Sequence, residues 1–154
     1  MWLPAFKKIR RISGNNRSDS FMGSDLSYED MATRQLDHYK HTIISKEIYQ
    51  NITCYKLQYI PKENTNTEYG QHISLIDSTL LVPLKEQSYD KSNKLIKEKI
   101  FTYKLINGYQ ILIEITVENV QKNHMTNLVF NNIELNTGIS NKIFHERYLK
   151  RMPK

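Results

Sequence analysis

The side chains that could take part in metal binding are few and scattered along this chain. Five histidines occur, at His38, His41, His72, His124 and His145. His38 and His41 are three residues apart, a spacing that places them on opposite faces of a strand. No acidic cluster accompanies them to complete a metal shell. The sequence therefore predicts no metal site and no cofactor.

Nucleophilic and acid–base chemistry have equally little support. Cys54 is the one cysteine, and without a basic neighbour in the sequence it fits a buried structural thiol. The five glycines are isolated, so no phosphate-binding loop is present. Glu29 and Asp30 are adjacent, an arrangement that suits the start of a helix better than catalysis. The sequence points away from an enzyme.

A short cationic segment offers a different chemistry. Lys7, Lys8, Arg10 and Arg11 lie close together in a chain of net charge +6. They could contact phosphate groups, but the segment lacks the aromatic side chains on which single-stranded nucleic acids stack. A basic module for anionic phospholipid or nucleic acid therefore stays as an alternative function, and nucleic acid is not the expected partner.

Length and composition indicate one domain built mainly of strands. The 154 residues suffice for one core, and an apolar content of 39% is low enough to favour an open or partly solvated sheet. Ten tyrosines and five phenylalanines against one tryptophan suit strands. No apolar run is long enough to span a membrane, and the first residues do not have the pattern of a signal peptide.

The pattern along the chain predicts an antiparallel meander with short helices. Alternating apolar and polar residues indicate strands at 7–12, 54–60, 72–76, 83–89, 94–103, 109–118 and 125–135. Asn107 and Gly108 predict a tight hairpin. Residues 36–46 are polar with scattered apolar positions, and a turn is expected within 47–51. Ser140 is the expected N-cap of a helix over 141–150 that folds back onto a sheet edge.

Residues 18–31 stand out among these strands. Phe21 and Met22 precede Gly23, whose backbone tolerates conformations that other residues resist. Ser27 is a good N-cap for a short helix that begins at Tyr28. Two interpretations stay open: an ordinary surface loop, or a lid over an apolar sheet face.

Several segments resemble the LolA-like, outer-membrane lipoprotein-sorting protein family. They are residues 2–12, 19–31, 54–55, 77–85, 89–90, 107–109, 118–119 and 138–151, with Ser-Phe-Met-Gly-Ser-Asp at 20–25 the most specific. The resemblance implies a periplasmic, non-enzymatic carrier: a half-barrel closed by helices that holds lipid or lipoprotein acyl chains in an apolar concavity. Partners would include a membrane transport complex or an outer-membrane acceptor. One departure is Leu75-Ile76 before Asp77, where family members tend to have a tryptophan.

The same resemblance predicts that residues 1–154 form a single domain matching the C-terminal portion of such a carrier, without its signal peptide and first strands. A half-barrel of this kind would expose an unpaired edge, which favours self-association. An inactive gene remnant is the other alternative. The expected lipid-binding residues share an apolar or aromatic character: Phe21, Met22, Tyr28, Met31, Tyr55, Leu57, Tyr59, Ile111, Ile113 and Ile115.

Overall fold

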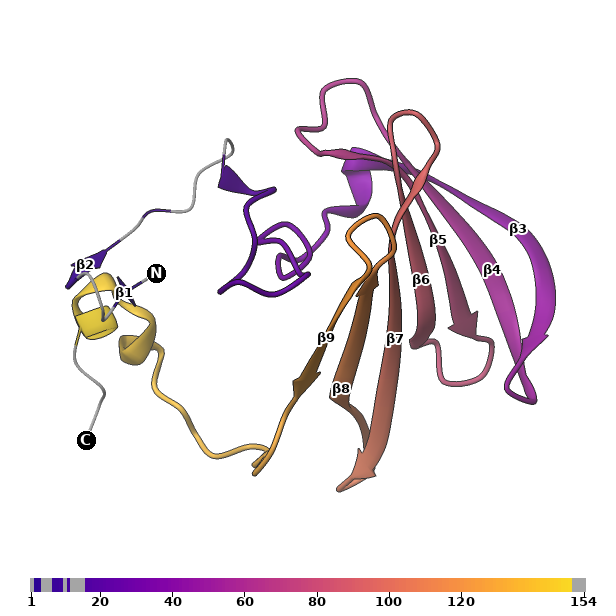
Figure 1. Ribbon diagram of the computed structural model, residues 1–154. Coiled ribbons are helices and arrows are strands. Elements are labelled where there is room, and N and C mark those ends of the chain that lie inside the picture. The colour runs from indigo at the N-terminus through magenta and orange to yellow at the C-terminus, as the bar shows by residue number, and fades with distance from the viewer. Residues whose placement is uncertain (1, 4–6, 10, 12–15, 151–154) are drawn as a thin grey trace.

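The chain forms one curved antiparallel sheet with a long N-terminal segment lying across its concave side (Figure 1). The computed structural model describes residues 2–3, 7–9, 11 and 16–150. The seven strands of the sheet follow sequence order: β3 (Tyr39–Tyr49), β4 (Ile52–Pro61), β5 (Tyr69–Asp77), β6 (Pro83–Asp90), β7 (Leu95–Ile106), β8 (Tyr109–Asn119) and β9 (His124–Val129). The sheet does not close, so the predicted fold class, mostly β with an open half-barrel, is confirmed.

Two shorter strands, β1 (Trp2–Leu3) and β2 (Lys8–Ile9), pair with each other in a separate ladder. Figure 1 shows them apart from the main sheet. The predicted strand over 7–12 is thus limited to two residues within the part of it that is described. Residues 10 and 12 of that prediction lie outside the described residues.

The helical segments are short 3-10 helices. They are η3 (Leu36–His38), η4 (Asn141–Phe144) and η5 (Glu146–Lys150). Ser140 caps η4 as expected, because its hydroxyl accepts from the Lys142 amide. Phe144 is 77% exposed, and Figure 1 shows η4 and η5 beside β1 and β2, away from the seven-stranded sheet, so the expected packing of this region on an edge of that sheet is not seen. No helix among the described residues is long and apolar enough to cross a bilayer.

Strand β3 is the element that the sequence pattern missed. The sequence predicts no strand over 36–46 and a turn within 47–51, and only Tyr39 among the residues of β3 is buried. The reason is that β3 lies at the edge of the sheet, where solvent reaches both faces and the usual alternation of apolar and polar residues disappears. The turn into β4 lies at Gln50 and Asn51, both in the left-handed region at φ 50° and 64°.

The hairpin between β7 and β8 confirms the prediction from Asn107 and Gly108. Both residues have positive φ, 50° and 84°, as a two-residue type I′ turn requires. Further along the same ladder a β-bulge shifts the register: Thr102 pairs with Glu114, but Tyr103 pairs with Leu112. The extra residue in β8 reverses the side to which the following side chains point.

This bulge overturns one prediction about β8. Ile111, Ile113 and Ile115 do not share a face, although their spacing predicts that they do. Ile115 and Leu112 pack on the strap side of the sheet, in the apolar cluster around Val117. Ile113 instead lines a 390 Å³ depression on the opposite side, together with Lys104 and Glu114, and Ile111 pairs with Lys104.

Residues 16–35, here called the strap, cross the concave side of the sheet. Leu26, which is 3% exposed, packs with Ile115 and Val117 of β8, and Phe21 packs against the same cluster. Further along the strap, Asp30 and Arg34 reach side chains of β6 and β7. The strap is therefore attached by an apolar contact at one end and by ion pairs at the other.

Candidate functional site

The concave side of the sheet, here called the inner face, has a polar half and an apolar half. Residues that are opposite each other on paired strands point to the same face, so the register defines rows across the sheet. Two adjacent rows carry the polar band, formed by His72, Ser74, Glu86, Ser88, Lys97 and Lys99. The next rows carry the apolar band, formed by Tyr55, Ile76, Phe101, Tyr103, Leu112, Ile115 and Leu128. The strap lies over the polar band.

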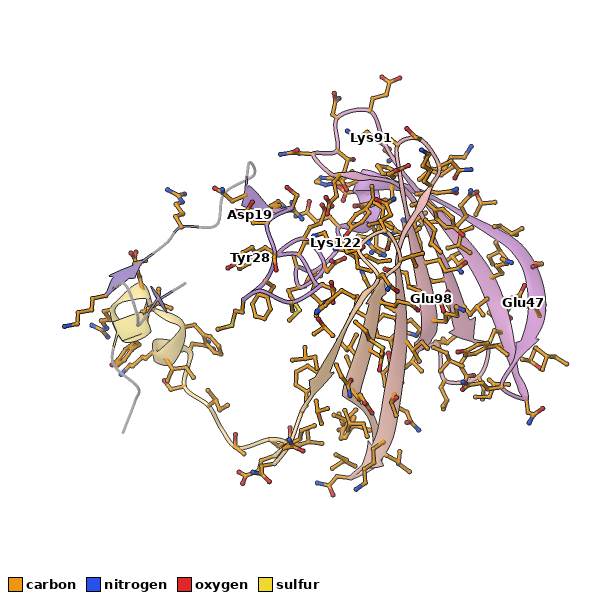
Figure 2. The ribbon with its side chains drawn as sticks, in the orientation of Figure 1. Asp19, Tyr28, Glu47, Lys91, Glu98 and Lys122 are labelled. Atoms are coloured by element: carbon orange, nitrogen blue, oxygen red, sulfur yellow. The ribbon has the colours of Figure 1, made fainter. Side chains whose placement is uncertain are left out.

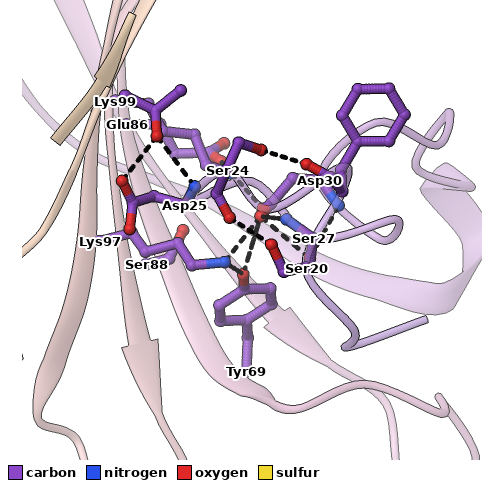
Figure 3. A network of polar contacts seen from close by, with 12 residues as sticks. Ser20, Ser24, Asp25, Ser27, Asp30, Tyr69, Glu86, Ser88, Lys97 and Lys99 are labelled. Carbon is purple, nitrogen blue, oxygen red and sulfur yellow. Dashed lines mark hydrogen bonds and ion pairs between the residues drawn. The ribbon is translucent and has the colours of Figure 1, made fainter. Parts of the chain in front are cut away.

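Asp30 is the centre of the contacts between the strap and the polar band (Figure 3). Its carboxylate lies 2.8 Å from the Lys97 ammonium and 2.5 Å from that of Lys99. The hydroxyl of Tyr69 donates to the same carboxylate at 3.1 Å. The side chains of Asp30 and Lys99 are 1% and 4% exposed, so this ion pair is buried.

Glu86 is the second anion of the polar band. It receives two parallel hydrogen bonds from the Arg34 guanidinium, at 2.9 and 3.1 Å, and a third from Ser74 at 3.0 Å. The Lys99 ammonium lies 3.2 Å from Glu86 Oε1, an oxygen that also accepts from Arg34, and so bridges Glu86 and Asp30. Because the Arg34 guanidinium makes two hydrogen bonds, its orientation is fixed as well as its distance from Glu86.

The local sequence around Asp30 explains how it is aimed. The Ser27 amide donates to the Asp30 carboxylate at 2.8 Å, and the Asp30 amide donates back to the Ser27 hydroxyl at 3.2 Å. This reciprocal pair has the pattern of a capping box, but the chain makes only a turn there and the predicted short helix does not form. The turn therefore presents the carboxylate to β7.

Burial and neighbouring charges act in opposite directions on these groups. Burial disfavours the charged form of both carboxylates, yet Lys99 and Lys97 hold the pKa of Asp30 well below its usual range. Lys99 and Arg34 have the same effect on the pKa of Glu86. Burial, with the positive charge of Arg34, lowers the pKa of His72 to about 3, so this histidine is neutral. Its Nδ1 lies 2.9 Å from the Ser88 hydroxyl.

Two polar cavities adjoin the strap. One of 260 Å³ lies between the strap and strands β3 and β5, and is lined by residues such as Arg17, Glu29, Arg34, Tyr39 and His72. The other, of 240 Å³, lies between the strap and the ends of β7 and β8. No group of three or more histidine, cysteine or acidic side chains gathers in a metal-binding arrangement within the described residues. Three cations, Lys97, Lys99 and Arg34, share the two carboxylates of Asp30 and Glu86, so each charged group has a partner, which suits the network to holding the strap in place.

The predicted lipid-binding residues occupy four different environments, one of which is the outer face with Ile111 and Ile113. Phe21 and Ile115 meet in the apolar cluster beneath the strap, where Tyr28 makes an edge-to-face contact with Phe21 at 5.6 Å. Tyr55, Leu57 and Tyr59 lie half-buried on the inner face of β4. Met22 and Met31 are exposed.

Some important positions were missed by the sequence patterns. Leu26 is the buried apolar residue by which the strap packs on the sheet, and Asp30, Lys97 and Lys99 form the ionic attachment of the strap. The Ser-x-x-Asp spacing at Ser27 was the available signal for Asp30, but nothing local indicates that its partners are two lysines near the start of a distant strand. Lys7 and Arg11 are exposed; the position of Arg10 and the side chain of Lys8 lie outside the described residues.

Comparison with known proteins identifies the family of this chain. A family model described as "uncharacterized protein" matches residues 1–151. The chain belongs to that family. No curated protein matches it.

Three solved structures are similar to this member of the family. A domain from Vibrio parahaemolyticus, described as an outer membrane lipoprotein-sorting protein, is 30% identical with a TM-score of 0.90, over 97% of this chain and 64% of that one. A DUF1329 family protein from Desulfovibrio piger is 31% identical with a TM-score of 0.88, over 96% and 62%. A LolA superfamily protein from Nitrosomonas europaea is 18% identical with a TM-score of 0.69, over 86% and 60%, a likeness of fold.

The fold is therefore LolA-like, as the sequence resemblance implied. The Vibrio parahaemolyticus domain that is described as lipoprotein-sorting has this fold. This chain spans less than two thirds of the length of each of these structures, between 60% and 64%.

Proposed function

We propose that the protein is a non-enzymatic periplasmic carrier that holds the acyl chains of lipids or lipoproteins against the apolar band. The observation that carries this proposal is the position of that band: it lies on the inner face of an open sheet, next to the area that the strap covers. Phe101, Tyr103 and Leu112 there are only half-buried, so their apolar surface is available to a ligand. The similar domain described as lipoprotein-sorting supports the same ligand class.

Acyl-chain binding needs apolar area more than specific polar contacts. Each methylene removed from water contributes about 0.8 kcal/mol, so about ten methylenes supply some 8 kcal/mol before the entropic cost of association. Polar or charged groups placed in such a surface would weaken binding, because they lose hydrogen bonds to water. The separation of the polar band from the apolar band satisfies this requirement.

The proposed ligand contacts follow from the inner face. Tyr55 and Ile115 of the apolar band remain from the sequence-based set, and so do Leu57 and Tyr59, which lie opposite Ser74 and His72. The strap residues Phe21, Met22, Tyr28 and Met31 also stay in the proposed set. Phe101, Tyr103 and Leu112 are added, because they point to the same face as Ile115. Ile111 and Ile113 are removed, because the bulge places them on the outer face. A membrane transport complex or an outer-membrane acceptor would be the protein partner.

The direct test is binding of a fluorescent fatty-acyl probe to purified, delipidated protein. Phe101→Ser should weaken binding about tenfold, since it removes apolar contact area worth more than 1.4 kcal/mol. Ile100→Ser is the matched control, because Ile100 is the next residue of β7, is 36% exposed and lies on the outer face.

Tyr103→Ser gives a second measurement in case Phe101→Ser reduces folding. Equal probe binding by all three variants and the unaltered protein would contradict the proposal. Probe binding that disappears steeply with added salt would instead favour a basic surface for anionic groups.

A further inference from the structure

Strand β3 offers the longest free edge of the sheet. It runs from Tyr39 to Tyr49 and pairs with β4 on one side, while no described segment pairs with its other side. At the opposite edge, β9 is only six residues long. Figure 2 shows Glu47 on this outermost strand. Backbone groups along such an edge can form a ladder with another strand.

The edge is apolar as well as unpaired. Ile43, Ile44 and Ile48 are 61%, 50% and 76% exposed. Natural sheet edges are commonly protected by charges, and here the flanking charges are Lys40, Lys46 and Glu47. Within the chain Glu47 also lies 3.3 Å from the Lys56 ammonium of β4, and its carboxylate can accept a second cation. An exposed apolar centre with a lysine on one side and a glutamate on the other suits a partner strand with the same features in reverse order.

The sequence of β3 itself provides that partner. If two copies of β3 run antiparallel around the centre of Ile43 and Ile44, the opposite residues are Ile43 with Ile44, Thr42 with Ser45, His41 with Lys46, Lys40 with Glu47 and Tyr39 with Ile48. Two-fold symmetry repeats each pair, so two Lys40–Glu47 pairs form. Opposite charges across antiparallel strands are favourable, and apolar residues meet at the centre.

The β-bulge in β3 makes this register geometrically consistent. In a regular strand, residues an odd number of positions apart point to opposite faces and could not pair in this way. The ladder to β4 shifts between Ile43 and Ser45, so His41 and Lys46 lie opposite Tyr59 and Tyr55, which share the inner face. Lys40 and Glu47 accordingly share the outer face. Along a strand, the N–H and C=O groups of successive residues point alternately toward β4 and toward the free edge. In the proposed register, residues whose backbone groups point toward the free edge therefore lie opposite each other.

We infer that two copies of this chain associate through β3 in that register, forming one continuous sheet across the dimer axis. The inner faces of the two copies then lie on the same side of the joined sheet. This inference does not depend on acyl-chain binding, because it rests on the edge strand alone.

The test is the oligomeric state of the purified chain by sedimentation velocity over a range of concentrations. A concentration-dependent dimer is expected. Ile43→Lys should abolish it, whereas Ile139→Lys should leave it unchanged, since Ile139 is equally exposed, at 62%, but lies outside β3. A chain that stays monomeric at all concentrations, or a dimer that survives Ile43→Lys, would overturn the inference.

Charge exchange tests the register itself. Lys40→Glu alone and Glu47→Lys alone each place like charges opposite each other twice, and should weaken the dimer by about tenfold or more. The double variant Lys40→Glu/Glu47→Lys should recover most of the lost affinity. If the double variant is no better than the single ones, the copies do not meet in this register.

A covalent probe separates this interface from other partners. An equimolar mixture of a Thr42→Cys chain and a Ser45→Cys chain should form an intermolecular disulfide on mild oxidation, because these positions are opposite. Cys54, which is buried, provides no competing thiol. A mixture of Thr42→Cys and Lys40→Cys chains is the mismatched control, because Lys40 lies opposite Ile60 in its own chain and away from Cys54. Equal cross-linking in both mixtures would argue for a non-specific encounter and against the proposed ladder.

Discussion

Lys97 and Lys99 share one face of β7 with Phe101 and Tyr103, yet the two halves of that face behave differently. The lysines are buried beneath the strap and hold carboxylates at 2.5 to 3.2 Å. The aromatic residues are half-buried, and the nearby packing is apolar. Ion pairs have defined directions and distances, so they fix one position of the strap. Apolar contacts are non-directional, so the other half can accept ligands of varied shape.

The comparison also shows why the strap cannot be a simple lid over an apolar face. Burying ions is costly, and their mutual attraction offsets the loss of hydration only when every charge has a partner. Removing one partner therefore has a larger effect than removing an apolar contact of similar size. Four experiments rank these effects.

The largest expected effect follows from removing the charge of Asp30. Asp30→Asn leaves Lys97 and Lys99 without their shared anion, and should lower the free energy of unfolding by about 3–5 kcal/mol. Glu29→Gln is the control, because Glu29 is adjacent but makes no ion pair with these lysines. Urea unfolding measures both. Adding Lys99→Met to Asp30→Asn should restore part of the loss; similar stabilities for Asp30→Asn and Glu29→Gln would show that the ion pairs do not hold the strap.

The apolar attachment of the strap should matter somewhat less. Leu26→Ala removes a fully packed side chain from the cluster with Ile115 and Val117, and should cost about 2–4 kcal/mol in the same unfolding assay. Leu36→Ala, at a residue of the adjoining 3-10 helix that is 73% exposed, should change stability by less than about 0.5 kcal/mol. Comparable effects of the two substitutions would mean that the apolar cluster contributes little to strap attachment.

The polar band should also make stability depend on pH. In the unfolded chain His72 becomes protonated below about pH 6.5, whereas in the folded protein its pKa is about 3. The unfolded state therefore binds more protons in this window, and stability decreases as the pH falls, by at most about 1.4 kcal/mol per pH unit. The depressed pKa values of Asp30 and Glu86 extend the loss to lower pH.

Unfolding measured between about pH 7 and pH 5 isolates the histidine, since carboxylates titrate mainly below this range. His72→Gln should flatten the dependence, whereas His145→Gln, at an exposed residue, should not. An unchanged slope in His72→Gln would assign the pH dependence to other groups.

The smallest effect concerns the hydrogen bond beside His72. Ser88 is fully buried, and Ser88→Ala removes the hydroxyl at 2.9 Å from Nδ1. The expected cost is about 1 kcal/mol, with Ser92→Ala in an exposed turn as the control. A loss as large as that of Asp30→Asn would mean that the polar band acts as one cooperative unit.

Much of the sheet was predictable because its central strands have strong local signals. The alternation of residue types in β4 predicted a strand with one buried face, and Asn107–Gly108 predicted a hairpin. The edge strand β3 was not, since its exposed faces produce no alternation. In β8 the alternation was present but misleading, because a bulge that depends on pairing with β7 changes the face between Leu112 and Glu114.

The candidate site divides in the same way. The alternate spacing of Tyr55, Leu57 and Tyr59 predicts that they share one face of a strand, and in the structure they lie on the inner face. Leu26 and Asp30 were missed as anchors, because their partners are far away in the sequence: Lys97 and Lys99 are more than sixty residues from Asp30. Lysines in a strand ordinarily indicate a solvated face, and only the strap makes these two buried.

The sequence by itself determined the strand-rich class, the main turns, the family resemblance and the apolar character of the central strands, since each depends on neighbouring residues. Tertiary structure decided which face each strand presents after a bulge, which charges are buried, and where the strap lies. The physical reason is that burial and pairing are properties of contacts between distant segments. The ionic attachment of Asp30 exists only when β6, β7 and the strap meet.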